Sequence, residues 1–225
     1  NGQVILSWLV VPCTTYILSS TAASSAICAG TTATINLTGL AANLPTGTYT
    51  VTYNLGAPNA ATGLTAAMTV STAGTGSFTT ATIANSGATG ITITNLTKNG
   101  CSSSISLLNT TTITVNQLPT ANAGSPLAAI CKDNSTVALG GSVGGSATGG
   151  IWSSNVAGGT FANNTGTTPE ATTWTPPTGY VGTVTFTLTT TGGTCGTTTV
   201  TKTQVIQEPT ANAGTVLAAI CQGGT

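Results

Sequence analysis

The chain has no histidine and no arginine, and only six of its 225 residues are charged. These six are Lys98, Lys132, Asp133, Glu170, Lys202 and Glu208. Without histidine there is no Ser-His-Asp or Cys-His arrangement. Three dispersed carboxylates offer neither a neighbouring acid–base pair nor a set of calcium ligands. We therefore expect no catalysis, no cofactor and no metal site.

The formal net charge is zero, so the sequence has no basic patch that would attract nucleic acid or an anionic membrane. The apolar run at residues 4–11 is too short to span a bilayer. It also lacks the preceding Lys or Arg of a signal peptide. We interpret it as a strand, either the last strand of a preceding module or an arm that pairs with a neighbouring sheet, and a targeting segment is the alternative.

Threonine takes the place of charge on this chain. The sequence contains 53 Thr, and Ser and Asn are also frequent. Because threonine is β-branched it favours strands, whereas Gly, Asn and Pro favour turns. This composition is typical of an all-β protein whose surface is hydrated by hydroxyl groups.

A repeat organises the chain. The segment 119–131, PTANAGSPLAAIC, returns at 209–221 as PTANAGTVLAAIC, which is a spacing of 90 residues. About 90 residues is the size of one small β-sandwich. We expect four parts: residues 1–20, an N-terminal arm or the end of a preceding module; 21–118, a first sandwich; 119–208, a second sandwich; and 209–225, the opening strand of a truncated third.

Short segments in which apolar residues alternate with Thr or Asn predict the strands of both sandwiches, because a period of two marks half-buried antiparallel strands. In the first sandwich these segments are 34–38, 48–55, 66–70, 77–83, 90–94 and 111–115. In the second they are 136–139, 150–153, 159–162, 171–175, 183–189 and 197–201. The apolar positions expected to form the first core are Ile35, Leu37, Tyr49, Val51, Tyr53, Met68, Val70, Ile91, Ile93, Ile113 and Val115.

Two tryptophans, Trp152 and Trp174, lie inside predicted strands of the second sandwich. A pair of indoles can stack on sugars, but one tryptophan per sheet more often fills a sandwich core. We expect both to be core residues.

Several segments together resemble a known type of repeat. They are the opening PTANAG with Ile-Cys, the strand TVAL at 136–139, GIWS at 150–153, and GTVTFTL at 182–188 followed by the turn GGTC. They are similar to the PKD-like and immunoglobulin-like repeats of large Bacteroidota surface proteins, which the type nine secretion system exports and which include gliding adhesins. The first sandwich resembles another repeat of those proteins. The resemblance implies tandem antiparallel β-sandwiches on a cell surface.

The six cysteines contain no CxxC pair and the chain has no histidine, which argues against a zinc site and favours disulfides of an exported protein; free buried thiols are the alternative. Pairing within modules would join Cys28 to Cys101 and Cys131 to Cys195. In an immunoglobulin-like sandwich, however, those cysteines would lie at opposite poles, too far apart for a bond. A staggered pattern would instead join Cys28 to Cys195 across the junction and Cys13 to Cys101, and would leave Cys131 and Cys221 for modules outside this chain.

Five Asn-x-Ser/Thr sequons are candidate glycosylation sites if the source glycosylates asparagine. They begin at Asn36, Asn95, Asn109, Asn134 and Asn163.

Two functions remain open from the sequence. The modules are spacers of an extracellular fibre, or they bind a glycan or surface through a cluster of exposed aromatic residues drawn from Trp8, Tyr16, Trp152 and Tyr180. The apolar ends at 4–11 and 215–221 are expected to pair with neighbouring modules or chains by strand addition.

Overall fold

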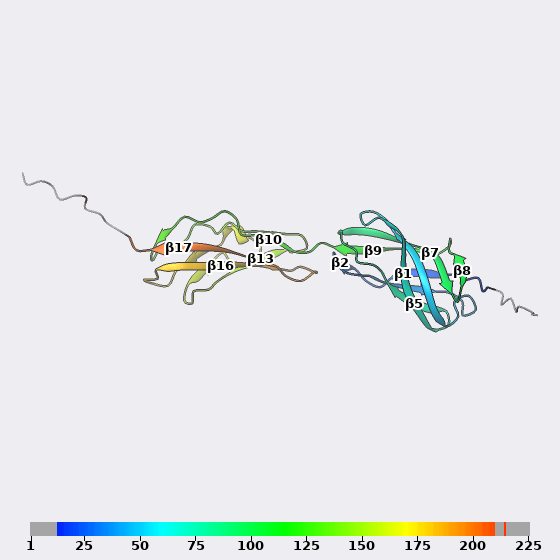
Figure 1. Ribbon diagram of the computed structural model, residues 1–225. Coiled ribbons are helices and arrows are strands. Elements are labelled where there is room, and N and C mark those ends of the chain that lie inside the picture. Colours follow the sequence, from blue (N-terminus) through cyan, green and yellow to red (C-terminus); the bar gives the residue numbers. More distant parts are fainter. Residues whose placement is uncertain (1–12, 210–213, 215–225) are drawn as a thin grey trace, which may run out of the picture. The chain divides into compact units, whose positions relative to one another are not determined.

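The computed structural model describes residues 13–209 and residue 214 (Figure 1). The chain divides into two compact units, Asn1–Leu118 and Pro119–Thr225, here called the first and second modules. In the described residues the only helical element is the short 3-10 turn η1 (Pro169–Ala171), and all other regular structure is β-strand. The predicted all-β fold is therefore confirmed. None of these residues forms a helix long and apolar enough to span a membrane.

The first module is a curled sheet that forms the two layers of a sandwich, and all its strand pairs are antiparallel except β2 with β9. Its strands are β1 (Ser20–Ala23), β2 (Ile27–Cys28), β3 (Thr34–Thr38), β4 (Gly47–Leu55), β5 (Ala61–Thr72), β6 (Thr75–Thr79), β7 (Gly87–Lys98), β8 (Cys101–Ser104) and β9 (Thr110–Asn116). The strand order is β1-β3-β6-β5-β4-β7-β9-β2, and β8 pairs with β7. The long strand β5 pairs with both β4 and β6 and so links the two layers. This is the order of an immunoglobulin-like sandwich.

The core of the first module follows from the period of two along its strands. In β4, for example, Tyr49, Val51 and Tyr53 are buried, whereas the threonines between them are exposed or half-buried. All eleven apolar residues expected in the core are buried. Alternation places apolar side chains on one face of each strand, so burying that face fixes the register.

The N-terminal boundary of the first module lies earlier than residue 21. Tyr16 and Leu18 are buried in its core, and the ring of Tyr16 contacts that of Tyr49 edge-on at 5.1 Å between centroids. The backbone N–H of Tyr16 donates to Ser103 Oγ at 2.9 Å. The assignment of residues 13–20 to a separate arm is therefore wrong, because their apolar side chains complete this core.

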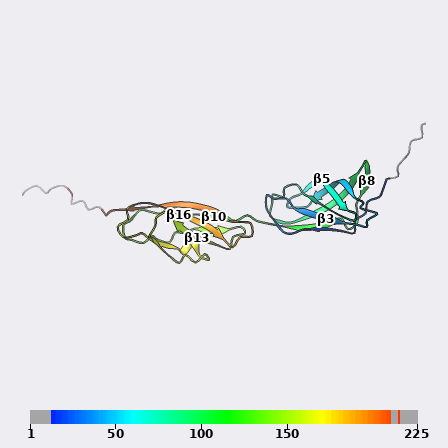
Figure 2. The same cartoon turned by 90° about the horizontal axis from the view of Figure 1, so that it is seen from below.

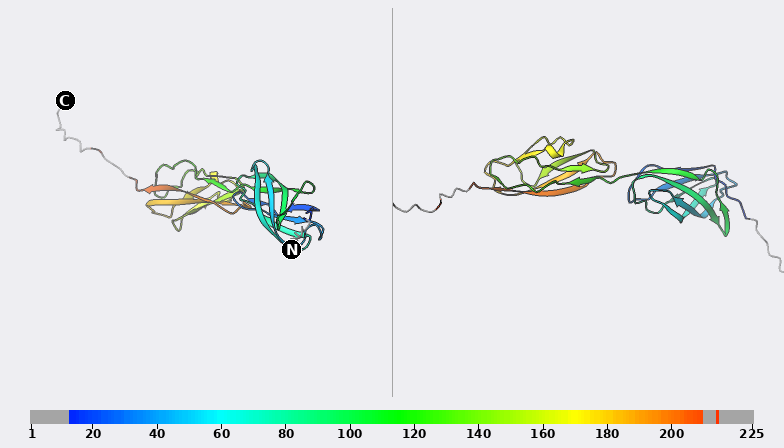
Figure 3. Two further views of the ribbon diagram at one scale, coloured as in Figure 1. Left: turned by 45° about the vertical axis from the view of Figure 1, so that its right-hand side comes forward. Right: turned by 90° about the horizontal axis from the view of Figure 1, so that it is seen from above.

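The second module repeats half of this arrangement. Its strands are β10 (Thr120–Asn122), β11 (Ile130–Cys131), β12 (Ser142–Gly144), β13 (Gly149–Ser154), β14 (Thr160–Ala162), β15 (Thr173–Thr175), β16 (Gly182–Thr191) and β17 (Thr199–Gln207). Its largest sheet has the order β11-β17-β16-β13, which corresponds to β2-β9-β7-β4 of the first module. The pair β10-β12 contacts β13, β16 and β17, and the pair β14-β15 packs Phe161 and Trp174 against Phe186 of β16, so both pairs cover the apolar face of that sheet. In Figure 3 the long strands run along each module.

An aromatic cluster fills the second core. The ring of Phe186 contacts those of Trp152, Phe161 and Trp174 at 6.4, 6.1 and 5.2 Å between centroids, each roughly edge-to-face. Trp152 and Trp174 are 1% and 0% exposed. Edge-to-face packing is the favoured geometry of such rings.

Some predicted strands are wrong in detail. Residues 136–139 form no regular strand. The N–H groups of Thr136 and Leu139 do donate to the carbonyls of Trp174 and Thr172, but the N–H of Trp174 donates to the side chain of Thr136 and not to a backbone carbonyl. The strand predicted at 77–83 ends at Thr79. The strand predicted at 171–175 is shorter than expected, because Ala171 is the last residue of the 3-10 turn η1, which begins at Pro169, and β15 begins only at Thr173. The apolar runs at 4–11 and 215–221 lie outside the described residues, as do Trp8 and Cys221.

Candidate functional site

Each charged side chain in the described part of the chain has a structural partner or stands alone on the surface. Lys98 donates to the carbonyl of Thr46 and lies over the ring of Tyr49. Lys202 donates to the carbonyl of Leu139, and burial lowers the pKa of its ammonium group. Glu170 is exposed on η1. No three His, Cys, Asp or Glu side chains among the described residues are grouped so that they could hold a metal ion.

The aromatic residues suggested for sugar binding do not form an exposed cluster. Trp152 and Tyr16 are buried, and Tyr180 is half-buried beside its own loop, where its hydroxyl donates to the carbonyl of Thr183. Trp8 lies outside the described residues. The indole N–H of Trp152 is used inside the core, where it donates to the carbonyl of Pro169 at 2.9 Å.

The five sequons differ in accessibility. Asn36, Asn134 and Asn163 are exposed. Asn109 is half-buried, and its side-chain nitrogen donates to the carbonyls of Ile93 and Ile105. Asn95 is also half-buried, and its side-chain oxygen accepts from Thr97 and Ser102. Attachment of a sugar at Asn109 would break two hydrogen bonds, so the exposed three are the better candidates.

The two ends of each module can be named from the path of the chain. We call the end at which the chain enters the N-terminal pole and the end at which it leaves the C-terminal pole. In the first module Cys13, the first residue that the structure describes, lies beside the β7–β8 hairpin at Lys98, and the chain leaves at Asn116, whose neighbour Val115 lies opposite Gly87. Lys98 and Gly87 are the two ends of β7, so the poles lie roughly 35 Å apart. Figure 2 shows β8 at one end of this module, beyond β3 and β5.

The second module has the same polarity. Thr120 pairs with Gly144, next to the turn in which Thr148 donates to the carbonyl of Thr191. The chain leaves at Gln207, whose neighbour Ile206 lies opposite Gly182. Gly182 and Thr191 are the two ends of β16, which places the poles of this module roughly 30 Å apart.

A disulfide closes the N-terminal pole of the first module. Cys13 and Cys101 are bonded, with Cα atoms 5.3 Å apart and a sequence separation of 88. This is the pairing that the staggered pattern predicts for the N-terminal cysteine. Pairing of Cys28 with Cys101 is therefore wrong, since Cys101 is already bonded.

The C-terminal pole of both modules has the same corner. In the first, β2 pairs parallel with the end of β9, so that Cys28 lies opposite Asn116. In the second, β11 pairs parallel with the end of β17, so that Cys131 lies opposite Gln207. Sequence reasoning missed both two-residue strands, although the recurring tripeptide Ala-Ile-Cys at 26–28 and 129–131 could have indicated them.

The other cysteines of the two modules differ in whether they are disulfide-bonded. Cys28 and Cys195 are each disulfide-bonded. Cys131 is a free, half-buried thiol, so it is not bonded to Cys195 of its own module. Cys131 lies at the Gly182 end of β16, whereas Cys195 follows its Thr191 end, and a disulfide requires Cα atoms within about 7 Å.

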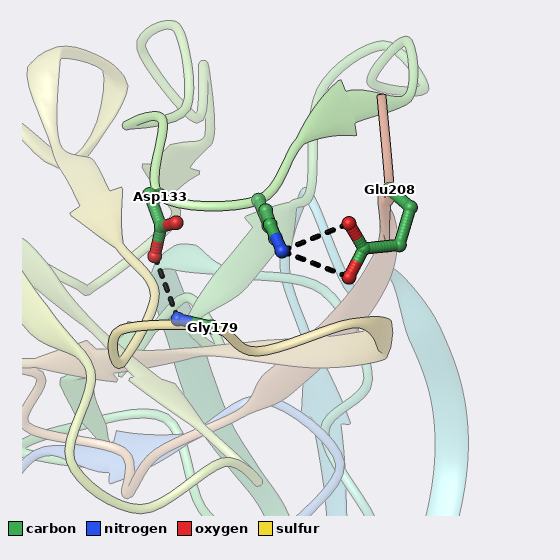
Figure 4. A network of polar contacts seen from close by, with 4 residues as sticks. Asp133, Gly179 and Glu208 are labelled. Carbon is green, nitrogen blue, oxygen red and sulfur yellow. Dashed lines mark hydrogen bonds and ion pairs between the residues drawn. The ribbon is translucent and has the colours of Figure 1, made fainter. Parts of the chain in front are cut away.

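A small polar network surrounds the corner of the second module (Figure 4). The ammonium of Lys132 lies 2.9 Å from Glu208 Oε2, and the hydrogen bond from Lys132 to Glu208 raises the pKa of the lysine. Asp133 Oδ1 accepts the backbone N–H of Gly179 at 2.6 Å. The network ties the corner next to Cys131 to the residue at which the chain leaves the module.

These features define the class of the protein as tandem immunoglobulin-like β-sandwich modules. No protein-family model matches the chain, and no curated protein matches its sequence. Among solved structures, DIP-gamma IG1+IG2 is similar with a TM-score of 0.44 and 10% identity, over 85% of this chain and 99% of that one. The tandem Ig repeats of Dlar are similar with a TM-score of 0.32 and 7% identity, over 85% and 97% of the two chains. The Yersinia pseudotuberculosis adhesin InvE is similar with a TM-score of 0.27 and 11% identity, over 82% and 58%.

Proposed function

We propose that this segment is a non-catalytic spacer in a long extracellular fibre or stalk on a bacterial surface. The observation that carries the proposal is the polarity of the two modules. In each one the chain enters at one pole and leaves at the other, roughly 30 to 35 Å away along a central strand. A series of such modules gains length with every module added, which is the property that a spacer requires.

The surface of the second module supports a structural role. The outer face of β16 and β17 is covered by three cross-strand pairs of threonines. They are Thr185 with Thr203, Thr187 with Thr201, and Thr189 with Thr199. All six side chains are exposed or half-buried. Opposed threonines stabilise a sheet by hydrogen bonding and packing. This face is hydrated and regular, and it carries no charge that would attract a charged partner.

Disulfide chemistry supports an extracellular location. The bond between Cys13 and Cys101 closes a loop of most of the first module. Such bonds form and persist in oxidising compartments and are rare in the cytosol. The resemblance to repeats of Bacteroidota surface proteins supports the same location and the bacterial source.

The test is a measurement of length. We define the three-module chain as residues 1–221 followed by a second copy of residues 132–208, which completes a third module on its own opening segment. Small-angle X-ray scattering on this chain should give a maximum dimension greater by about 30 to 35 Å than that of a matched chain of residues 1–208. An added module that leaves the maximum dimension unchanged overturns the spacer proposal.

Glycan or surface binding is the competing function. It is weakened because Tyr16 and Trp152, two of its proposed aromatic contacts, are buried in the cores. A glycan array probed with residues 1–225 separates the two functions. A spacer gives no signal above that of an unrelated β-sandwich, whereas saturable binding to one glycan class would favour the adhesive function.

A further inference from the structure

The largest sheet of the second module ends at β13, whereas the first module continues past the equivalent strand. In the first module β4 pairs with β7 on one side and with β5 on the other. In the described part of the second module β13 pairs with β16 alone, and the next strand along the chain, β14, pairs with β15 instead. The outer edge of β13 is therefore at a position where the first module carries another strand.

The segment 163–166 covers this outer edge without forming a strand. The side chain of Asn164 bonds both backbone groups of Trp152, since its oxygen accepts the Trp152 N–H at 2.9 Å and its nitrogen donates to the Trp152 carbonyl at 2.8 Å. Two residues earlier on the same edge, the N–H of Gly150 donates to the carbonyl of Gly166 at 2.8 Å. In an antiparallel ladder a residue exchanges both bonds with the residue opposite. The amide of Asn164 reproduces that exchange with a side chain.

The segment is held closely against this edge. A Cβ placed on Gly149 would lie 2.2 Å from the carbonyl oxygen of Gly166, so the two backbones approach more closely than a side chain at Gly149 would allow. On the other side of Asn164, the hydroxyl of Thr172 donates to the carbonyl of Asn163 at 3.3 Å. The contacts of Asn163 and Gly166 thus fix the backbone on both sides of Asn164, and its side-chain amide is held in position.

Charge does not protect this edge from other chains. The unpaired N–H and C=O groups of an exposed edge strand are a template for pairing with another strand, and proteins commonly block such edges with lysine or another charged side chain. The sequence has no charged residue between Asp133 and Glu170, a stretch that includes both β13 and the segment 163–166. In this part of the chain a neutral amide occupies the place that a charge takes elsewhere.

We propose that the outer edge of β13 is a strand-accepting surface, and that Asn164 closes it against the β13 edge of a second copy of this chain. The first module shows that the equivalent edge takes a strand, because β5 pairs along β4 there. A second copy is the partner because each copy carries the same edge, and two β13 strands that meet antiparallel pair their outward residues with each other. The inference goes beyond the spacer function and does not depend on it, since it concerns contacts between the sides of modules.

The experiment compares residues 1–225 with the variant Asn164→Ala over a series of protein concentrations. Amide hydrogen exchange at Trp152, measured by NMR, reports the state of the edge, and sedimentation velocity reports association. At low concentration the Trp152 amide of the variant should exchange about tenfold faster than that of the parent, because it loses its hydrogen bond. As the concentration rises, the variant should form dimers and its Trp152 amide should regain protection, since β13 of the second copy supplies a new acceptor. The parent should show neither change.

The matched control is Thr165→Val, which removes a hydroxyl from the same segment that lies 3.3 Å from the hydroxyl of Thr167, and it should behave as the parent does. Asn164→Ser, whose side chain is too short to bond both groups of Trp152, repeats the test if the alanine variant does not fold.

The proposal is overturned if the Trp152 amide of a variant with the parent's β-sheet circular dichroism exchanges at the parent's rate, because Asn164 would then not close the edge. It is also overturned if exchange is faster but the variant stays monomeric over the whole series, because the open edge would then take no strand. The length of the monomer does not depend on Asn164, so either result leaves the spacer function to be decided by the scattering measurement.

Discussion

Gly30 and Asp133 occupy the same position of the same turn, two residues after the corner cysteine of their modules, and both have a positive φ, 83° and 65°. Glycine adopts this conformation readily, whereas other residues are strained in it and Asp and Asn are among the few that tolerate it. In the second module the aspartate also gains a hydrogen bond, because its carboxylate accepts the N–H of Gly179. Different residues, Gly30 and Asp133, thus adopt the positive φ that this turn requires in the two modules.

This relationship predicts an order of stability for substitutions of Asp133. Asp133→Ala loses the hydrogen bond and keeps a strained φ, so it should destabilise the second module by about 1 to 3 kcal/mol. Asp133→Gly loses the same hydrogen bond without the strain and should cost about 1 kcal/mol less than the alanine variant. Urea unfolding monitored by the fluorescence of Trp152 and Trp174 measures both. An alanine variant as stable as the glycine variant would contradict the explanation.

Substitution of the two buried tryptophans should have unequal effects. The indole N–H of Trp152 donates to Pro169, whereas that of Trp174 is buried without a hydrogen-bond partner among the described residues. Both Trp→Phe changes remove the same atoms, but only Trp152→Phe leaves a carbonyl of the core without its donor. Trp152→Phe should therefore lower the free energy of unfolding of the second module by about 1 to 2 kcal/mol more than Trp174→Phe does. Urea unfolding followed by circular dichroism tests this, and equal losses would refute it.

Alkaline pH should destabilise the first module through Tyr49. Burial, with a smaller contribution from the neighbouring Tyr16, raises the pKa of Tyr49 to about 12. The folded state thus holds this proton more tightly than the unfolded chain, whose tyrosine titrates near 10. The stability that this provides is fully present below pH 10 and is lost as the pH rises from 10 to 12, by roughly 1 to 2 kcal/mol.

The control for this prediction is Tyr49→Phe, which lacks the titrating hydroxyl. It is expected to be less stable than the parent at neutral pH, because the hydroxyl donates to the carbonyl of Pro45 at 2.6 Å. Its stability should, however, fall less between pH 10 and 12. Tyr180→Phe in the second module should leave the alkaline transition of the first module unchanged. Parallel pH profiles for the parent and Tyr49→Phe would exclude Tyr49 as the cause.

The bond between Cys13 and Cys101 should stabilise the first module alone. It spans 88 residues of sequence and restricts the unfolded chain over that length. Its loss in a Cys13→Ser, Cys101→Ser double variant should cost about 2 to 4 kcal/mol. The urea midpoint of the first module should fall, whereas that of the second should not move. Replacing both cysteines together avoids a new free thiol, and an unchanged midpoint for the first module would contradict the expectation.

The sequence predicts the longer strands well and the short ones poorly, for a physical reason. Where Tyr49, Val51 and Tyr53 alternate with threonine, one face must be buried, and the period alone identifies strand and core. The strands Ile27–Cys28 and Ile130–Cys131 are two residues long and have no period, and their partners β9 and β17 lie more than 70 residues away. The predicted strand at 136–139 has the right composition, but the side chain of Thr136 competes for the N–H of Trp174.

The candidate site was harder to predict, since it depends on long-range register. That Cys28 and Cys101 lie at opposite poles follows from an immunoglobulin-like strand order, which the sequence suggests through its strands and turns. The network at Lys132, Asp133 and Glu208 has no local signal, because Lys132 and Glu208 are far apart in sequence and meet only when β11 pairs with β17.

The partner of Cys28 can be predicted from the poles at which the cysteines lie. Cys28 lies at the C-terminal pole of the first module, opposite Asn116, and Cys195 lies at the N-terminal pole of the second, in the turn after β16. These are the two poles that the short connection through Leu118 and Pro119 joins. We therefore expect Cys28 and Cys195 to be bonded to each other, as the staggered pattern predicts.

A peptide map of residues 1–225 without reduction should contain this pair, and Cys28→Ser should make Cys195 open to alkylation while the bond between Cys13 and Cys101 persists. If Cys195 stays protected in Cys28→Ser, its partner is another cysteine and the stagger is wrong at this junction. If the pair is found, its selective removal should increase bending at the junction, which the distance distribution from small-angle scattering would record as a loss of the longest distances.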